Sequence, residues 1–214
     1  MPRPDRIDCA FFDFDGTLAD TEVLGLQIDL RVMPKLFGFT PEWEELLTTI
    51  GTNGDDTFPP IFARRGIEMT ADDYWEMRGG NQEVYFSAPL EVFPGGVELL
   101  ESLAARGVKM GLVSTTNRPC IDEAIRRLDL AKYFSVSVCG TEPPACKPAP
   151  DPYLMALEMI GADPAHTVVF EDSPSGIAAA KAAGLYVIAF KGGVAELDTS
   201  AADEEIRSYE GFSL

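Results

Sequence analysis

The second half of the chain alternates between short apolar runs and helix-type patterns, and this alternation constrains the fold more than any other feature. Apolar and β-branched runs predict strands near residues 108–113, 134–138, 167–170 and 185–190. Helices are expected at about residues 94–106, 121–128, 152–160 and 174–183. Repeated strand and helix units form a parallel sheet with helices on both faces. We therefore expect an α/β fold with a Rossmann-like parallel sheet.

The region from residue 20 to residue 91 interrupts this pattern. Its apolar residues recur at helical spacing, and glycine-containing turns near residues 38, 51–54 and 66 separate the segments. The sequence thus predicts a cap of about four helices inserted at 20–91, with a core made of 1–19 and 92–214. The apolar run at 7–12 is expected to join the same sheet. The tail after residue 192 is acidic and weakly patterned, so no element is predicted there.

Charge and cysteine usage exclude several classes of function. The chain of 214 residues has 17 basic and 35 acidic residues and a net charge of −18, which argues against nucleic-acid or membrane partners. Its four cysteines form no C-x-x-C pair, and with one histidine they argue against zinc. No signal peptide and no apolar run of about 18 residues is evident. We expect a cytoplasmic protein, monomeric or weakly dimeric.

The segment 13–17, Asp-Phe-Asp-Gly-Thr, directly follows the first apolar run. Residues two apart in a strand point the same way, so Asp13 and Asp15 begin on one side, and Gly16 lets the chain turn away. Two neighbouring carboxylates in a partly dry site repel each other and require a cation, for which oxygen ligands favour Mg²⁺. The alternative interpretation is an ordinary Asp/Gly turn.

Three further motifs follow predicted strands, where open α/β sheets bind ligands. The hydroxyl-rich segment 114–117 suits phosphate oxygens, although such clusters more often cap helices. Lys147 lies in a loop stiffened by prolines, where an exposed surface lysine is the ordinary case. Glu171 and Asp172 end a strand, and Asp172 is equally compatible with capping of the next helix.

Together the four segments resemble the haloacid dehalogenase-like hydrolase superfamily. The D-x-D-G-T loop, the serine at a strand end, the K-P-x-P segment and the E-D-S-x-x-G loop occur in the family's order over essentially the whole chain. The insert resembles the small helical cap of the subgroup that includes phosphoglycolate phosphatase and β-phosphoglucomutase.

The resemblance implies a role for each motif residue. Asp13 would attack phosphorus and form an aspartyl-phosphate, and Asp15 would serve as general acid and then as general base. Ser114 and Lys147 would bind the oxygens of the transferring phosphoryl group. Mg²⁺ would be held by Asp13, the backbone carbonyl of Asp15 and Asp172, with Glu171 in or near its shell.

Further substrate contacts are expected from the loops beside these residues. They are Gly16, Thr115, Thr116 and Asn117 in the core, and Thr52 and Asn53 in the cap loop.

The resulting hypothesis is a Mg²⁺-dependent phosphatase of a small phosphorylated metabolite, such as a sugar phosphate. One alternative is a phosphomutase of the β-phosphoglucomutase type, which carries a histidine and an arginine where this chain has Gly25 and Gly54. The other is a signalling receiver that accepts a phosphoryl group without turnover. A receiver needs neither Asp15 nor the helical insert.

Overall fold

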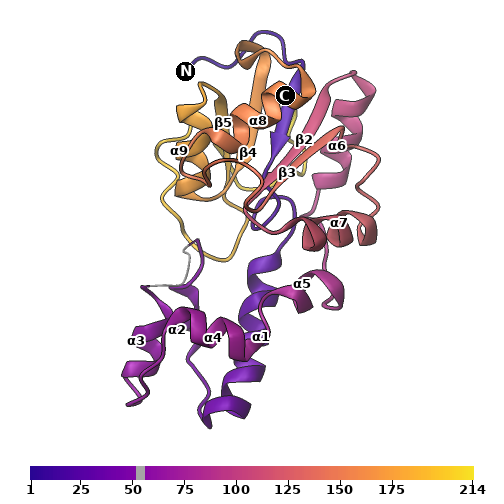
Figure 1. Cartoon of the computed structure of the whole chain (residues 1–214). Helices are drawn as coiled ribbons and strands as arrows, with labels where there is room; N and C mark the ends of the chain where they lie inside the picture. Colours follow the sequence, from indigo (N-terminus) through magenta and orange to yellow (C-terminus); the bar gives the residue numbers. More distant parts are fainter. Residues whose placement is uncertain (52–55) are drawn as a thin grey trace.

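A six-stranded parallel sheet forms the centre of the computed structural model, which describes residues 1–51 and 56–214. The strand order is β3-β2-β1-β4-β5-β6 (Figure 1). The strands are β1 (Cys9–Phe12), β2 (Lys109–Ser114), β3 (Val136–Cys139), β4 (Thr167–Glu171), β5 (Tyr186–Phe190) and β6 (Glu204–Ile206). This arrangement confirms the predicted α/β class and its Rossmann-like parallel sheet.

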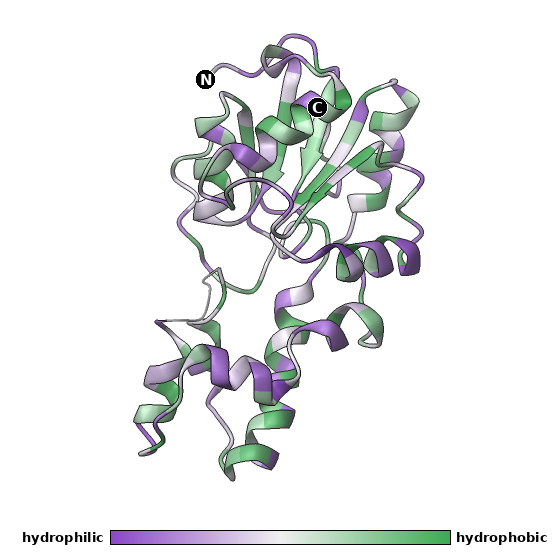
Figure 2. Cartoon of the chain, viewed as in Figure 1, coloured by the Kyte–Doolittle hydropathy of each residue, from purple (hydrophilic) through white to green (hydrophobic). Residues whose placement is uncertain are grey.

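Helices cover both faces of the sheet. Helices α6 (Gly96–Ala105) and α7 (Arg118–Arg127) pack on one face, and α8 (Asp151–Ile160) and α9 (Pro174–Ala182) pack on the other. Strand β1 is buried on both sides, with Ala10 and Phe12 in one hydrophobic cluster and Cys9 and Phe11 in the other. Figure 2 accordingly shows hydrophobic residues concentrated in the strands. Because the paired strands all run parallel, the loops that follow them lie at one edge of the sheet.

The observed strands differ from the predicted ones by one or two residues at their ends. The exception is β6, which the sequence analysis missed. It has three residues, two of them glutamates, and it pairs with β5 at the edge of the sheet. A strand so short and so polar carries no hydrophobic pattern, which is why the tail gave no signal.

The insert between β1 and α6 is helical, as predicted. Its described residues, 20–51 and 56–91, contain five helices, where about four were expected. They are α1 (Thr21–Phe37), α2 (Trp43–Leu47), α3 (Phe58–Ala63), α4 (Ala71–Arg78) and α5 (Gln82–Phe86). The helix not anticipated is α5, which follows a Gly-Gly turn and packs on α7 of the core. The domain boundaries 1–19 with 92–214 and 20–91 stay a prediction.

The insert has its own hydrophobic cluster, and a segment of the core reaches it. Helices α1 to α4 surround buried residues that include Met33, Phe62 and Tyr74. Leu197, from the loop between β5 and β6, packs against this cluster, and an added Cβ at Gly51 would lie 2.9 Å from its Cδ2. Cap and core therefore touch at a point other than the two chain crossings. Within the described chain, the helices are all too short or too polar to cross a membrane.

Candidate active site

The four predicted motifs meet at the carboxyl-terminal edge of the sheet (Figure 1). Asp13 directly follows β1, Ser114 ends β2 and Glu171 ends β4. Lys147 lies between β3 and α8 and reaches across β2, where its Nζ donates to the carbonyl of Val113 at 2.9 Å. Parallel strands direct all these loops to one edge, which explains why residues more than 150 positions apart converge.

Lys147 is the buried cation of the site. Its Nζ lies 2.6 Å from Oδ1 of Asp13 and 2.5 Å from Oε1 of Glu171, and only 3% of its side chain is exposed. Burial alone favours loss of the proton, but the carboxylates of Asp13 and Glu171 outweigh it and raise the pKa of Lys147 well above its usual range. Lys147 therefore stays protonated and holds one oxygen of Asp13 in place.

Glu171 is fully buried, and both its oxygens accept hydrogen bonds. Oε1 accepts from Lys147 and from the hydroxyl of Tyr153 at 3.0 Å. Oε2 accepts from the backbone N–H groups of Asp172 and Ser173 and from the Ser173 hydroxyl, at 3.1–3.2 Å. A carboxylate so completely engaged holds Lys147 and the turn before α9, which favours a supporting position over a direct metal ligand.

The carboxylates of this edge fit a divalent cation. Oxygens of Asp13, Glu171 and Asp172 lie within 4.8 Å of one another. Three acids face one lysine, so negative charge is in excess, and burial together with the neighbouring carboxylates raises the pKa of Asp13 and Asp172 well above their usual range. A hard cation with oxygen ligands, such as Mg²⁺, relieves that excess.

Two residues of the first loop shape the position of Asp172. The hydroxyl of Thr17 donates to Oδ1 of Asp172 at 3.0 Å. Gly16 has a φ of 72°, and a Cβ there would clash with Oδ2 of the same carboxylate. Gly16 was predicted to contact substrate, and in the structure its lack of a side chain makes room for Asp172.

Asp15 is held by hydroxyl groups. Its Oδ1 accepts from Tyr85 at 2.7 Å, and its Oδ2 accepts from Thr116 at 2.8 Å and from Ser114 at 3.2 Å. Ser114 also accepts from the backbone N–H of Thr116 at 3.0 Å. The carboxylate of Asp15 is thus oriented by the end of β2 and by α5. Tyr85 was missed by the sequence analysis because no motif marks it.

The remaining predicted contacts separate into three groups. Thr115 lines both pockets described below. The side chain of Asn117 accepts from the N–H of Cys120 at 3.2 Å and caps α7, and Asn117 is not among the described residues that line either pocket. Thr52 and Asn53 lie outside the described residues, as does Gly54.

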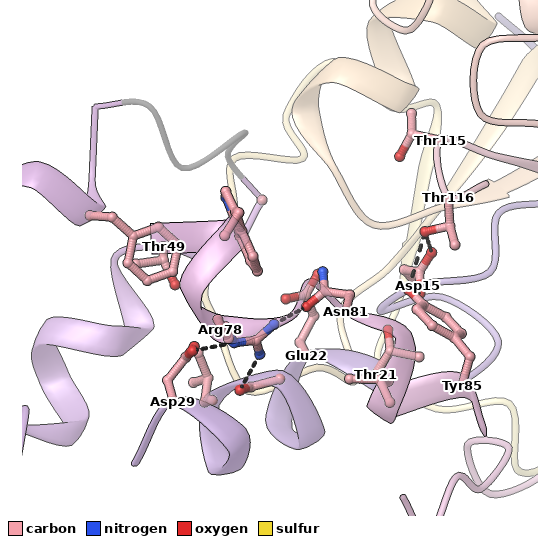
Figure 3. A pocket seen from close by; sticks show the side chains of 16 residues that line it. Asp15, Thr21, Glu22, Asp29, Thr49, Arg78, Asn81, Tyr85, Thr115 and Thr116 are labelled. Atoms are coloured by element: carbon pink, nitrogen blue, oxygen red, sulfur yellow. Dashed lines mark hydrogen bonds and ion pairs between the residues drawn. The ribbon is translucent and has the colours of Figure 1, made fainter. Parts of the chain in front are cut away.

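Two adjoining pockets open beside these side chains. The phosphoryl pocket has a volume of about 410 Å³ and contains Asp13, Lys147 and Asp172. The cap pocket has a volume of about 200 Å³ and is shown in Figure 3. The two share the lining residues Asp15, Glu22, Gly51 and Thr115. The two pockets therefore adjoin between Asp13 and the cap helices.

Polar residues of the cap pocket were missed from the sequence. Glu22 and Asp29 both lie on α1, seven residues apart, so they occupy one face of the helix, and this spacing was a signal that could have been used. Arg78 and Asn81 flank the turn between α4 and α5 and carry no sequence signal.

Comparison with known proteins agrees with this geometry. Residues 10–190 match the family model of the haloacid dehalogenase-like hydrolases. A phosphorylated carbohydrates phosphatase of Thermotoga maritima is 35% identical over 180 residues, covering 84% of this chain and 82% of the relative. A phosphoglycolate phosphatase of Shigella dysenteriae is 29% identical over 199 residues, covering 81% of this chain and 77% of the relative.

Solved structures show the same architecture. A protein of Thermotoga maritima, named as a proposed β-phosphoglucomutase, superposes with a TM-score of 0.79 at 30% identity and covers 95% of this chain and 96% of its own. CbbY from Rhodobacter sphaeroides, solved in complex with phosphate, superposes with a TM-score of 0.75 at 26% identity, with 95% of each chain covered.

The fold and the site define a hydrolase with a parallel α/β core and a helical insert. The chain belongs to the haloacid dehalogenase-like hydrolase family, which confirms the predicted resemblance. Within that family, its phosphatase relatives place it among the phosphoric monoester hydrolases.

Proposed function

We propose that the protein is a Mg²⁺-dependent phosphatase that hydrolyses the phosphate monoester of a small metabolite, such as a sugar, through an aspartyl-phosphate on Asp13. The observation that carries the proposal is the contact of Asp13 with a buried Lys147, beside Asp172 and next to a pocket that Asp15 also lines. The name of one relative, a phosphorylated carbohydrates phosphatase, supports this substrate class.

In the first step an oxygen of Asp13 attacks phosphorus. A bond forms between that oxygen and phosphorus while the bond from phosphorus to the ester oxygen breaks, and the leaving oxygen takes a proton from Asp15. Lys147 keeps Asp13 oriented and offers positive charge to the phosphoryl oxygens. Ser114 and Thr116 hold Asp15 where it can reach the leaving group.

In the second step water attacks the phosphorus of the aspartyl-phosphate. Asp15, now ionised, takes a proton from that water, the bond to the Asp13 oxygen breaks, and inorganic phosphate leaves. One residue thus serves in turn as acid and base, which requires an orientation that the three hydroxyl donors of Asp15 maintain.

Asp13, Asp172 and the backbone carbonyl of Asp15 would hold Mg²⁺, with Thr17 orienting Asp172 and Glu171 orienting Lys147. When bound, the ion supplies the charge that lets a carboxylate approach a phosphate dianion.

Water is the proposed acceptor of the phosphoryl group. The position at which the mutase uses a histidine is Gly25, whose backbone carbonyl accepts from Arg78 at 2.9 Å. The other mutase position, Gly54, lies outside the described residues. The resemblance to a structure named for β-phosphoglucomutase activity keeps the mutase as the second candidate. Membership of a hydrolase family argues against the signalling receiver. We further propose a cytoplasmic protein that is monomeric or weakly dimeric.

The test is phosphate release from a panel of monoesters with Mg²⁺, using Asp13→Asn as the blank. We expect phosphate release to require Mg²⁺. It should disappear with excess chelator and in the variant. Steady release by Asp13→Asn would contradict covalent catalysis. The mutase alternative is tested with β-glucose 1-phosphate and a trace of the 1,6-bisphosphate: glucose 6-phosphate appearing faster than free phosphate would overturn the choice of water.

A further inference from the structure

The cap pocket adjoins the phosphoryl pocket and faces the part of the substrate that leaves with the ester oxygen. Its lining comes from α1, from α4, α5 and the turn between them, from residues 49, 51 and 58 of the cap, and from residues 15, 115 and 116 of the core (Figure 3). The chemistry of this lining therefore decides which leaving groups fit.

Arg78 is the basic residue of the cap pocket, and the protein itself already neutralises it. Its Nε lies 2.5 Å from Oδ1 of Asp29, and only 1% and 3% of these two side chains are exposed. Nη2 donates to the carbonyl of Gly25 at 2.9 Å, and Nη1 donates to the carbonyl of Gly80 at 2.9 Å and to Oδ1 of Asn81. Nη1 and Nη2 thus donate hydrogen bonds to protein oxygens, whereas Nε is paired with Asp29 by charge without a hydrogen bond in the described structure.

The ion pair of Arg78 and Asp29 carries no net charge toward the pocket. Burial raises the pKa of Asp29, but Arg78 and the hydroxyl of Tyr74, which donates to the same carboxylate, oppose that rise. The ring of Trp75 lies 4.9 Å from the guanidinium and covers it from another side. Among the described residues that line the two pockets, Arg78 and Lys147 are the only basic ones.

The rest of the lining favours hydroxyl groups over anions. Glu22 lines both pockets, and burial together with Asp15 and Asp20 raises its pKa to about 7. Beside it, Thr21 is only 5% exposed, and yet its Oγ1 lacks a hydrogen-bond partner in the described structure. A buried hydroxyl without a partner is costly, and a polar ligand relieves that cost.

Asn81 offers the matching donors. Its Oδ1 accepts from Arg78, which turns its amide N–H groups to other partners. Acceptor, hydroxyl and amide donor thus lie in one small pocket, a set that suits an alcohol group, which both donates and accepts. A carboxylate or second phosphate there would lie beside Glu22 and Asp15, and Arg78, the one basic residue of the described lining, is already paired with Asp29.

We propose that the cap pocket receives an uncharged, hydroxyl-bearing leaving group and discriminates against substrates with a second anionic group. The ligand class is the monophosphate of a neutral polyol or sugar, as opposed to phosphorylated carboxylic acids or bisphosphates. Glu22, Thr21 and Asn81 are the residues that make this distinction. The inference rests on the proposed phosphatase function and narrows its substrate.

Two matched pairs of esters test the proposal. Glycerol 2-phosphate carries a hydroxymethyl group where glycerate 2-phosphate carries a carboxylate. Ethylene glycol monophosphate and phosphoglycolate form a second pair with the same difference. With the Mg²⁺-loaded enzyme, kcat/KM is expected to be about tenfold or more higher for the neutral member of each pair. Equal values, or preference for the carboxylates, would overturn the inference while leaving the phosphatase function intact.

Charge variants show whether Glu22 is responsible. Glu22→Gln should reduce the ratio between neutral and carboxylate esters, mainly by improving the carboxylate member. The matched control is Glu44→Gln, which removes one charge at an exposed position of α2 outside the two pockets and should leave the ratio unchanged. An equal change of the ratio in both variants would mean that the net charge of the protein, and not the position of Glu22, sets the preference. No change in Glu22→Gln would mean that this residue does not discriminate between the esters. Either result contradicts the proposal.

A binding measurement separates this inference from catalysis. Calorimetric titration of Asp13→Asn with the same esters and Mg²⁺ should show tighter binding of the neutral members. If neither wild type nor variant releases phosphate from any ester, the proposed function fails, and the binding order still decides whether the cap pocket prefers a neutral group. Tighter binding of the carboxylate esters would reject it.

Discussion

The two adjoining pockets treat their buried charges in opposite ways. The phosphoryl pocket is lined by one lysine and four acids, Asp13, Asp15, Glu22 and Asp172, so the excess negative charge calls for a metal ion before a phosphate can enter. In the cap pocket the only basic residue of the described lining, Arg78, is buried in an ion pair with Asp29, while Glu22 and Asp15 also line the pocket. The first arrangement leaves negative charge for a metal ion to balance, whereas in the second the protein already neutralises its arginine. In this protein the two pockets differ in how their basic residue is balanced, more than in how many charged residues line them.

The largest effect is expected from removing the nucleophile. Asp13→Asn should lower turnover by at least about 10⁴-fold, because an amide is a poor nucleophile and also loses its charge-assisted contact with Lys147. Steady-state phosphate release measures this, with circular dichroism to show that the fold is kept. Retention of more than a few per cent of the parent rate would contradict the assignment of Asp13 as the nucleophile.

Asp15→Asn is expected to lower kcat by about 10²–10⁴-fold, the usual worth of general acid and base catalysis. The nucleophile remains, so an ester with a very acidic leaving group, such as p-nitrophenyl phosphate, should be impaired less in the first step than a sugar phosphate. Equal loss with both esters, measured as the burst of nitrophenol and as phosphate release, would argue against Asp15 as the acid.

Breaking the buried ion pair of the cap pocket should destabilise the protein. Asp29→Asn leaves Arg78 charged and buried without its partner, and the free energy of unfolding is expected to fall by about 3–5 kcal/mol. Urea titration of the variant and the parent gives the difference. The exposed pair of Lys132 and Asp129 provides the control, since Asp129→Asn should cost less than about 1 kcal/mol. Similar losses of stability in both variants would show that the buried ion pair contributes no more than the exposed one.

Glu22 predicts a pH dependence of stability. Its pKa is raised from 4.5 to about 7 in the folded protein, so the folded state holds a proton that the unfolded state releases. The free energy of unfolding therefore falls as the pH rises from about 4.5 to about 7, and Glu22→Gln removes this contribution. The free energy of unfolding of the variant, relative to that of the parent, should therefore rise by about 1–3 kcal/mol between pH 5 and pH 8. A constant difference across that range would reject the raised pKa.

Tyr85→Phe tests the contact between α5 and the acid. Removal of the hydroxyl leaves Asp15 with its two donors from the core, so kcat should fall about three- to tenfold while KM stays nearly unchanged. Thr116→Val is the companion variant, which removes a donor from the core side. A rise in KM without loss of kcat for Tyr85→Phe would place the tyrosine in substrate binding.

The sequence was informative wherever function sits at the end of a regular element. Asp13, Ser114 and Glu171 each follow or end an apolar run, so period-two patterning and the parallel-sheet rule were enough to bring them together. Lys147 was correctly associated with them through its motif, although its burial between two acids was not foreseeable from a loop sequence.

The cap pocket was largely invisible to sequence reasoning. The pairing of Arg78 with Asp29 depends on how α4 crosses α1, and a helix of eight residues with an unremarkable pattern does not reveal that crossing. Tyr85 lies on a five-residue helix whose contact with Asp15 depends on the docking of α5 on α7. Positions fixed by packing between elements require the tertiary structure, whereas positions fixed at strand ends do not.

The contact of Leu197 with Gly51 has a consequence for turnover. Leu197 belongs to the loop that follows β5, yet it packs on the hydrophobic cluster of the cap. If the cap swings away to release product, this leucine is returned to water, at a cost of about 1 kcal/mol for a partly buried side chain. In that case the loop would act as a latch that lengthens the time the cap stays shut, and the rate of product release would depend on Leu197, which lines neither of the two pockets.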